Sequence, residues 1–248
     1  MAVDPIQIVP VSGKLMAPAA APALTYRGGP LLSTVQVHAM FWGAPWQQAP
    51  LATLESQLNG FFDYFVTSPL MDQLAEYGAP GLAIGHGAHL GSTVVADPAP
   101  AARLADVDVQ AFIAQELEKG TTIPQPSPNS LYFVYLPPGV SVTLSGSASC
   151  VGFCGYHSDL DLAAGTKIFY AVMPYPDCTG CAGGLSVVDA LTSTSSHELC
   201  EAITDPIPGQ GWYDDQNGEI GDICAWRTRK LGAYMVQLEW SNRAGRCI

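Results

Sequence analysis

Residues 185–203 read LSVVDALTSTSSHELCEAI, and their apolar side chains recur at the spacing of one helical face. These apolar positions are Val188, Leu191, Leu199, Cys200 and Ile203. The Asp205-Pro206 pair ends the predicted helix, because the residue before a proline disfavours the α conformation. The stretch therefore predicts a long helix that packs one face against the rest of the protein.

The same helix carries three ionisable side chains close together. His197 and Glu201 are four residues apart and project side by side, while Glu198 follows His197 on an adjoining face. In the zinc peptidase pattern H-E-x-x-H, the first and last residues bind the metal and the intervening Glu is the general base. The pattern here is H-E-x-x-E, which predicts His197 and Glu201 as metal ligands and Glu198 as the catalytic base. The ligand set suits zinc and also admits calcium or manganese.

An open catalytic metal site needs a third protein ligand. An acidic segment follows the helix at 212–222. Some zinc peptidases take their third ligand from a Glu that follows the helix histidine along the chain, and Glu219 and Asp222 follow His197 at a similar separation. Either residue is a candidate. Asp205 is less suitable, because at eight residues beyond His197 it would lie about 12 Å further along the helix axis.

Two other interpretations of the acidic segment stay open. Residues 214–219 offer Asp, Asn, Gly and Glu at short spacing, as calcium loops do, although the EF-hand template does not fit. A hairpin turn at Asn217-Gly218 would explain much of the same composition without an ion.

The remaining periodicity predicts a single α+β domain at 30–248, with a twisted, mixed sheet and a metal-bearing helix packed on it as in zinc peptidases. Strands are predicted at 34–42, 131–136, 167–174 and 235–240, the third at an edge or strand end, with a strand, turn and strand at 81–95. Helices are predicted at 51–65, 70–77 and 106–119. Residues 1–29 are rich in Pro and Ala and predict an extended N-terminal arm.

Composition limits the possible partners. The net charge of −12, from 22 acidic and 10 basic residues, would repel a phosphate backbone, which argues against nucleic acid as a partner. No apolar run approaches the 18 or more residues of a membrane span. The zinc peptidase pattern itself implies a peptide substrate.

The seven cysteines cluster in the C-terminal half, which is typical of disulfides formed in an oxidising compartment. The close pairs at 150/154 and 178/181 could instead form a four-thiolate zinc site, but disulfides are favoured. An odd count leaves one thiol, and Cys200 is the candidate because it falls inside the apolar helix. The prediction is a secreted protein, although Met1 to Asp4 does not begin a signal peptide.

Several short stretches, in order along the chain, resemble the phosphate-induced, EXORDIUM-like family of secreted cell-wall proteins of plants and their microbial relatives. The similar stretches are 26–32 (YRGGPLL), 154–157 (CGYH), the 178–181 region, 202–206 (AITDP) and 211–213 (GWY). The resemblance implies secretion and one domain. Plant members lack equivalents of His197, Glu198 and Glu201, so the resemblance implies no catalytic activity, and it favours a structural part for His157.

Together these patterns predict a secreted metal-dependent hydrolase, similar to zinc metallopeptidases, in which metal-activated water attacks the substrate. The alternative is a non-catalytic extracellular module that binds glycan or a cell-wall partner and uses the ion only to clamp the acidic segment to the helix. In that alternative, Trp42, Trp46, Trp212 and Tyr213 are candidates for stacking on sugars.

Overall fold

The computed structural model describes residues 8–11, 21–162 and 165–248. Within them, a sheet of six strands runs in the spatial order β1-β9-β10-β6-β3-β4. The strands are β1 (Ile8–Pro10), β3 (Gln36–Trp42), β4 (Ala88–Val95), β6 (Ser130–Tyr135), β9 (Phe153–Asp161) and β10 (Lys167–Met173). The four strands β4, β3, β6 and β10 are parallel, whereas β9 pairs antiparallel with both β10 and β1. The sheet is therefore mixed, as predicted.

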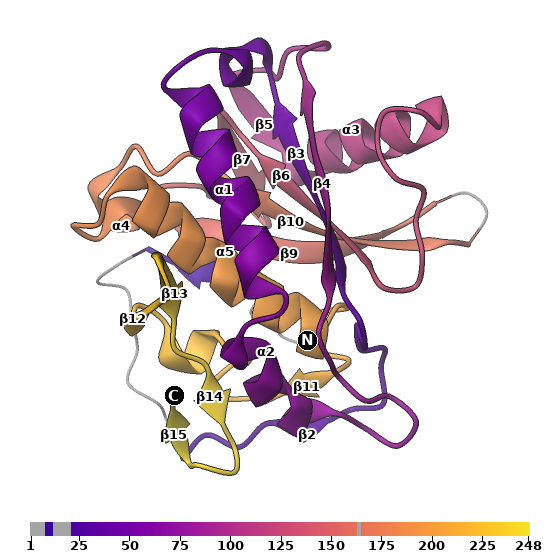
Figure 1. Cartoon of the computed structure of the whole chain (residues 1–248), viewed down its shortest axis with the longest axis vertical. Coiled ribbons are helices and arrows are strands. Elements are labelled where there is room, and N and C mark those ends of the chain that lie inside the picture. The colour runs from indigo at the N-terminus through magenta and orange to yellow at the C-terminus, as the bar shows by residue number, and fades with distance from the viewer. Residues whose placement is uncertain (1–7, 12–20, 163–164) are drawn as a thin grey trace.

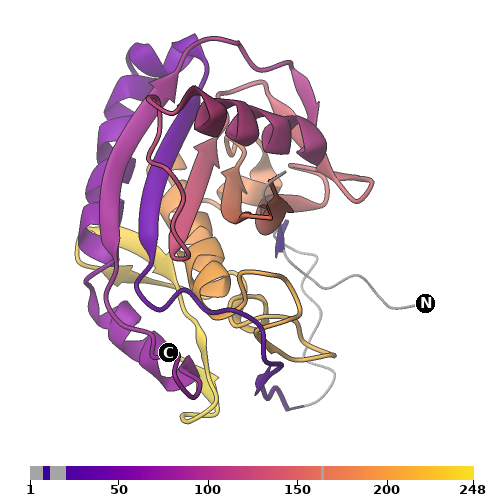
Figure 2. The same cartoon turned by 90° about the vertical axis from the view of Figure 1, so that its right-hand side faces the viewer.

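Helices cover both faces of the sheet (Figures 1 and 2). They are α1 (Leu51–Phe65), α2 (Pro69–Leu74), α3 (Asp106–Lys119), α4 (Thr179–Ala182) and α5 (Val187–Thr204), with short 3-10 turns η1 (Ala44–Gln47), η2 (Ala75–Tyr77) and η3 (Asp222–Cys224). On β6, Phe133 joins the core under α1 and α5, whereas its neighbour Val134 joins the core under α3. Alternate side chains of a strand point to opposite faces, so a strand buried on both sides is apolar throughout.

Short sheets surround this body. They pair β2 (Thr25–Tyr26) with β11 (Trp212–Tyr213), β12 (Thr228–Leu231) with β13 (Tyr234–Gln237), β14 (Trp240–Ser241) with β15 (Arg246–Cys247), and β7 (Ser141–Leu144) with β5 (Arg103–Ala105) and β8 (Ser147–Ala148). The C-terminal hairpin of β12 and β13 packs against α5 on the side away from β9 and β10. Helix α5 is thus enclosed between the sheet and the C-terminal segment.

The prediction of a single domain that combines helices with a mixed sheet is confirmed, and helices α1 and α3 have the predicted bounds. Three details differ. β10 is an interior strand between β9 and β6, so of the two predicted alternatives the strand end before Pro174 is confirmed and the edge position is wrong, and residues 81–95 form only one strand of the main sheet, β4. β9 was not predicted, because its sequence, FCGYHSDLD, mixes glycine and charged residues with apolar ones.

The described residues of the predicted N-terminal arm at 1–29 pair with strands of the domain. Residues 8–10 form the edge strand β1, where Val9 is buried against the sheet, and residues 25–26 pair with β11. An extended segment can add a strand to an exposed sheet edge through main-chain hydrogen bonds, which a Pro/Ala-rich composition does not reveal. Residues 1–7 and 12–20 lie outside the described residues.

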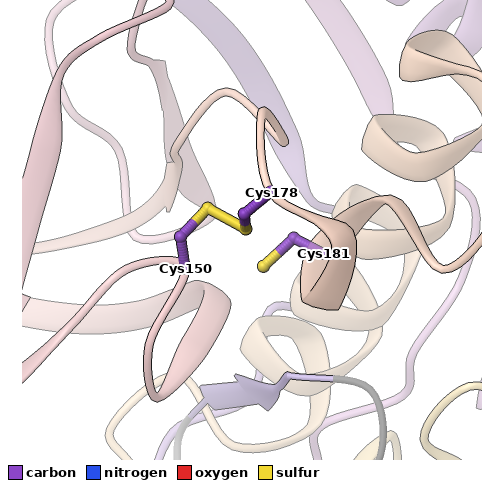
Figure 3. A group of neighbouring side chains, drawn as sticks. All are labelled: Cys150, Cys178 and Cys181. Atoms are coloured by element: carbon purple, nitrogen blue, oxygen red, sulfur yellow. A yellow bond between two sulfur atoms is a disulfide. The ribbon is translucent and has the colours of Figure 1, made fainter.

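Three disulfides join Cys150 to Cys178, Cys154 to Cys181 and Cys224 to Cys247. Figure 3 shows the first of them, with Cys181 beside it. Because all four clustered thiols are used in disulfides, a four-thiolate zinc site is ruled out, and the preference for disulfides is confirmed. The unpaired thiol is the buried Cys200, as predicted.

Candidate metal centre

The H-E-x-x-E motif lies in the most enclosed helix of the protein. Residues 190–204 of α5 are all buried. The helix begins after Ser186, whose hydroxyl accepts a hydrogen bond from the Asp189 amide, and ends at Asp205. Asp205 accepts hydrogen bonds from the amides of Gly209 and Gln210 at 2.7 and 3.0 Å, so its carboxylate shapes the turn after the helix and is not a candidate ligand.

His197, Glu201 and Asp222 form one group that could hold a metal ion. His197 Nε2 lies 2.9 Å from Glu201 Oε1 and 4.0 Å from Asp222 Oδ1. This nitrogen is fully buried, and within the described part of the chain its close partner is the Glu201 carboxylate. Asp222 also ties the acidic segment to the helix, because its amide donates to Glu201 Oε1 at 3.0 Å. Of the two downstream candidates, the structure thus brings Asp222 to the helix motif.

His157, Glu198 and Glu201 form a second group with the same potential. His157 Nδ1 lies 3.0 Å from Glu198 Oε2 and 3.6 Å from Glu201 Oε2. On the other side of the ring, His157 Nε2 lies 3.2 Å from the carbonyl oxygen of Asp205. His157, Glu198 and Glu201 are all fully buried. Glu201 belongs to both groups, with one carboxylate oxygen facing each histidine.

The other predicted ligand, Glu219, lies on the far side of His157. Its Oε1 is 3.5 Å from His157 Nε2, and its side chain is fully buried. It therefore joins the cluster of acids without joining either group of three. Glu239 is a further buried carboxylate that sequence reasoning did not single out; neither of its oxygens makes a hydrogen bond among the described residues.

Burial dominates the electrostatics of these carboxyl groups. Burial, together with the charge of Glu201, raises the pKa of Asp222 well above its usual range, and burial does the same for Glu239. Burial also acts on Glu201, but the neighbouring His197 and His157 outweigh it and hold its pKa at about 2. The centre therefore gathers more carboxyl groups than its two imidazoles can neutralise as carboxylates, so those with a raised pKa hold protons unless a cation takes the place of the protons.

A close backbone approach completes the centre. A methyl group at Gly221 would lie 2.8 Å from Nδ1 of His197 and 2.9 Å from Glu201 Oε1.

Replacing Gly221 with Ala is expected to displace both side chains and to destabilise the fold by about 1–3 kcal/mol. Equilibrium unfolding in urea, read with the metal content of the same samples, checks this. Gly85→Ala, where a Cβ would meet only the Ser33 carbonyl oxygen at 3.9 Å, controls for adding a methyl group, and equal effects of the two substitutions would contradict the expectation.

The structure disagrees with the aromatic candidates for sugar stacking. Trp46, Trp42 and Tyr213 have exposed fractions of only 0, 5 and 6%, and Trp212 is partly buried between Tyr26 and Tyr77. Large aromatic side chains are more often core residues, and here the core uses them. No stacking surface is built from these four.

The described residues include no helix long and apolar enough to cross a membrane. The three disulfides are compatible with an oxidising, extracellular location. No protein-family model matches the chain, and comparisons with curated proteins and with solved structures give no significant match. The resemblance to EXORDIUM-like proteins therefore stays a prediction, and the function has to be argued from the site.

Proposed function

We propose that this chain is an extracellular metalloprotein in which Glu201 holds a divalent cation between α5 and the acidic segment that ends in η3. The observation that carries the proposal is the environment of the Glu201 carboxylate. It is fully buried, its Oε1 lies 2.9 Å from His197 Nε2 and its Oε2 lies 3.6 Å from His157 Nδ1, and Oε2 makes no hydrogen bond in the described chain. Buried polar atoms are nearly always satisfied, so a buried carboxylate oxygen without a hydrogen bond, placed between two imidazoles, favours the binding of a cation there.

The mixture of imidazole and carboxylate donors favours zinc or manganese over calcium, which prefers oxygen ligands alone. Because the donors have no exposed surface apart from a side-chain exposure of 7% at Asp222, the geometry supports a structural role for the cation best. The cation would then fasten the acidic segment to α5, as in the clamp alternative.

Metal analysis tests this proposal. Protein purified without chelator or affinity metal is expected to contain bound zinc or manganese by mass spectrometry, and Glu201→Gln is expected to lose it. Glu116→Gln is the matched control, because Glu116 is equally buried but lies on α3, paired with Lys119. Metal retained in Glu201→Gln, or absent from the unmodified protein, would refute the proposal.

Hydrolysis by metal-activated water is the second candidate function. It is favoured by the partial exposure of Asp222, which leaves one side of the His197 group near solvent, and by Glu198, which follows His197 on the same helix. In this candidate Glu198 takes the proton from the bound water.

The test of this second function is turnover of a fluorogenic peptide library or of cell-wall material. Glu198→Gln is expected to abolish turnover while the metal stays bound, because Gln cannot accept the proton. Full turnover by Glu198→Gln would eliminate that role for Glu198.

A further inference from the structure

We propose that the centre binds two divalent cations, one beside His157 and one beside His197, with the Glu201 carboxylate bridging them. This inference rests on the proposed function, since it adds a second position to the same buried cluster. It assigns His157 and Glu198 as ligands. In the H-E-x-x-H pattern the residue after the first histidine is the general base, so this assignment gives Glu198 a different role.

The first step is the orientation of His157. Its Nε2 hydrogen is directed at the carbonyl oxygen of Asp205, 3.2 Å away, which leaves Nδ1 directed at Glu198 and Glu201. Metal-binding histidines usually donate their other ring hydrogen to a backbone carbonyl or carboxylate, which fixes the ring. A cation at Nδ1 would replace the proton that Nδ1 shares with Glu198 and release it to solvent. The His157 position is therefore oriented in advance for a cation.

The second step is the placement of Glu201. Its Oε1 lies 2.9 Å from His197 Nε2, and its Oε2 lies 3.6 Å from His157 Nδ1. Each histidine also has its own terminal carboxylate, Glu198 for His157 and Asp222 for His197. The two groups thus repeat one donor set of imidazole, terminal carboxylate and shared carboxylate. Paired cations lie about 3.5–4 Å apart in proteins, a spacing that a carboxylate bridge spans.

The third step is charge. Besides Asp205, whose carboxylate accepts hydrogen bonds from backbone amides, five carboxyl groups meet in one buried cluster: Glu198, Glu201, Asp222, Glu219 and Glu239. A single divalent cation balances the charge of two ionised carboxylates, so the other three must stay protonated or be paired with a second cation. Two cations compensate four of the five.

The two positions are not equivalent. The side-chain nitrogen of Gln237 lies 2.8 Å from His197 Nδ1 and donates to the Gly221 carbonyl at 2.9 Å, so it also donates to Nδ1 and leaves the ring hydrogen on Nε2. A cation at Nε2 moves that hydrogen to Nδ1, which requires the Gln237 amide to turn over. The His157 position needs no such rearrangement, so we expect it to fill first.

The experiment is a titration of metal-depleted full-length protein with zinc alone, scored by bound equivalents after gel filtration. The unmodified protein is expected to bind about two equivalents, and His157→Ala, Glu198→Gln and His197→Ala about one each. Glu201→Gln should bind none tightly. His86→Ala, at an exposed histidine paired with Asp72, and Glu116→Gln are the controls and should keep two.

The outcomes separate the two proposals. One equivalent in the unmodified protein, kept by Glu198→Gln, would overturn the second cation and leave the proposed function standing. No binding by the unmodified protein would remove both. Loading the unmodified protein with manganese tests the bridge without any variant. Two bridged manganese ions are expected to give a spin-coupled electron paramagnetic resonance spectrum. The spectrum of isolated ions at saturating manganese would overturn the bridge.

Discussion

Removal of divalent cations is expected to lower the thermal unfolding midpoint by about 10 °C. A ligand present at 100 to 1,000 times its dissociation constant stabilises the folded state by about 3–4 kcal/mol, and about 1 kcal/mol shifts the midpoint of a chain this long by about 2–4 °C. The loss arises because Glu201, Glu198 and Asp222 stay buried together in the metal-depleted fold without a compensating cation. The measurement is differential scanning calorimetry in EDTA.

The control for this prediction is EDTA already saturated with zinc, which has the same ionic strength and no chelating capacity. Adding excess zinc to the depleted protein should restore the original midpoint. An unchanged midpoint after exhaustive chelation, verified by metal analysis, would show that no cation stabilises the fold.

The second large effect is expected from the Cys224–Cys247 disulfide. Cys224 belongs to η3, the turn that begins at Asp222, so the bridge holds a candidate ligand in place from the C-terminal end of the chain. Replacing both cysteines with Ala should lower the free energy of unfolding by about 3 kcal/mol, as expected for a loop of this length. It should also weaken zinc binding, because Asp222 loses its anchor. Urea unfolding and zinc titration measure the two effects.

The matched control is the double replacement of Cys150 and Cys178, whose separation of 28 residues is close to the 23 of the C-terminal pair. It should cost a similar amount of stability while zinc affinity stays unchanged, because neither cysteine belongs to the elements that carry Glu201 or Asp222. Equal losses of zinc affinity in the two double variants would show that the Cys224–Cys247 bridge has no special relation to the centre.

The sequence alone predicts those elements whose apolar residues recur regularly within one segment. Helices α1 and α3 and the interior strand β6 follow from apolar spacing, and the pairing of His197 with Glu201 follows from their four-residue separation on one helix. The encounter of Asp222 with that pair was one of two alternatives that the sequence left open. The path of the chain after the helix, with the turn held by Asp205 and the hydrogen bond from the Asp222 amide to Glu201, is a tertiary feature that the sequence does not display.

The position of His157 on β9, beside α5, could not be predicted from the sequence. His157 reaches α5 because β9 pairs antiparallel with β10, and because Gly155 has no side chain where a Cβ would lie 2.6 Å from Thr194 Cγ2. Such tertiary pairings leave no periodic signal in one sequence. Whether His157 is a ligand or only structural is decided by zinc binding to His157→Ala. A glycine within an otherwise apolar stretch was the available hint, since it indicates a close approach of another element.

The central claim is that a cation binds at Glu201, and anomalous scattering from a crystal of zinc-soaked protein tests it most directly. The account predicts a zinc peak within about 2.0–2.2 Å of a Glu201 carboxylate oxygen, with an imidazole nitrogen of His157 or His197 at a similar distance. An ordered Glu201 side chain with no anomalous peak in the cluster at saturating zinc would contradict the account.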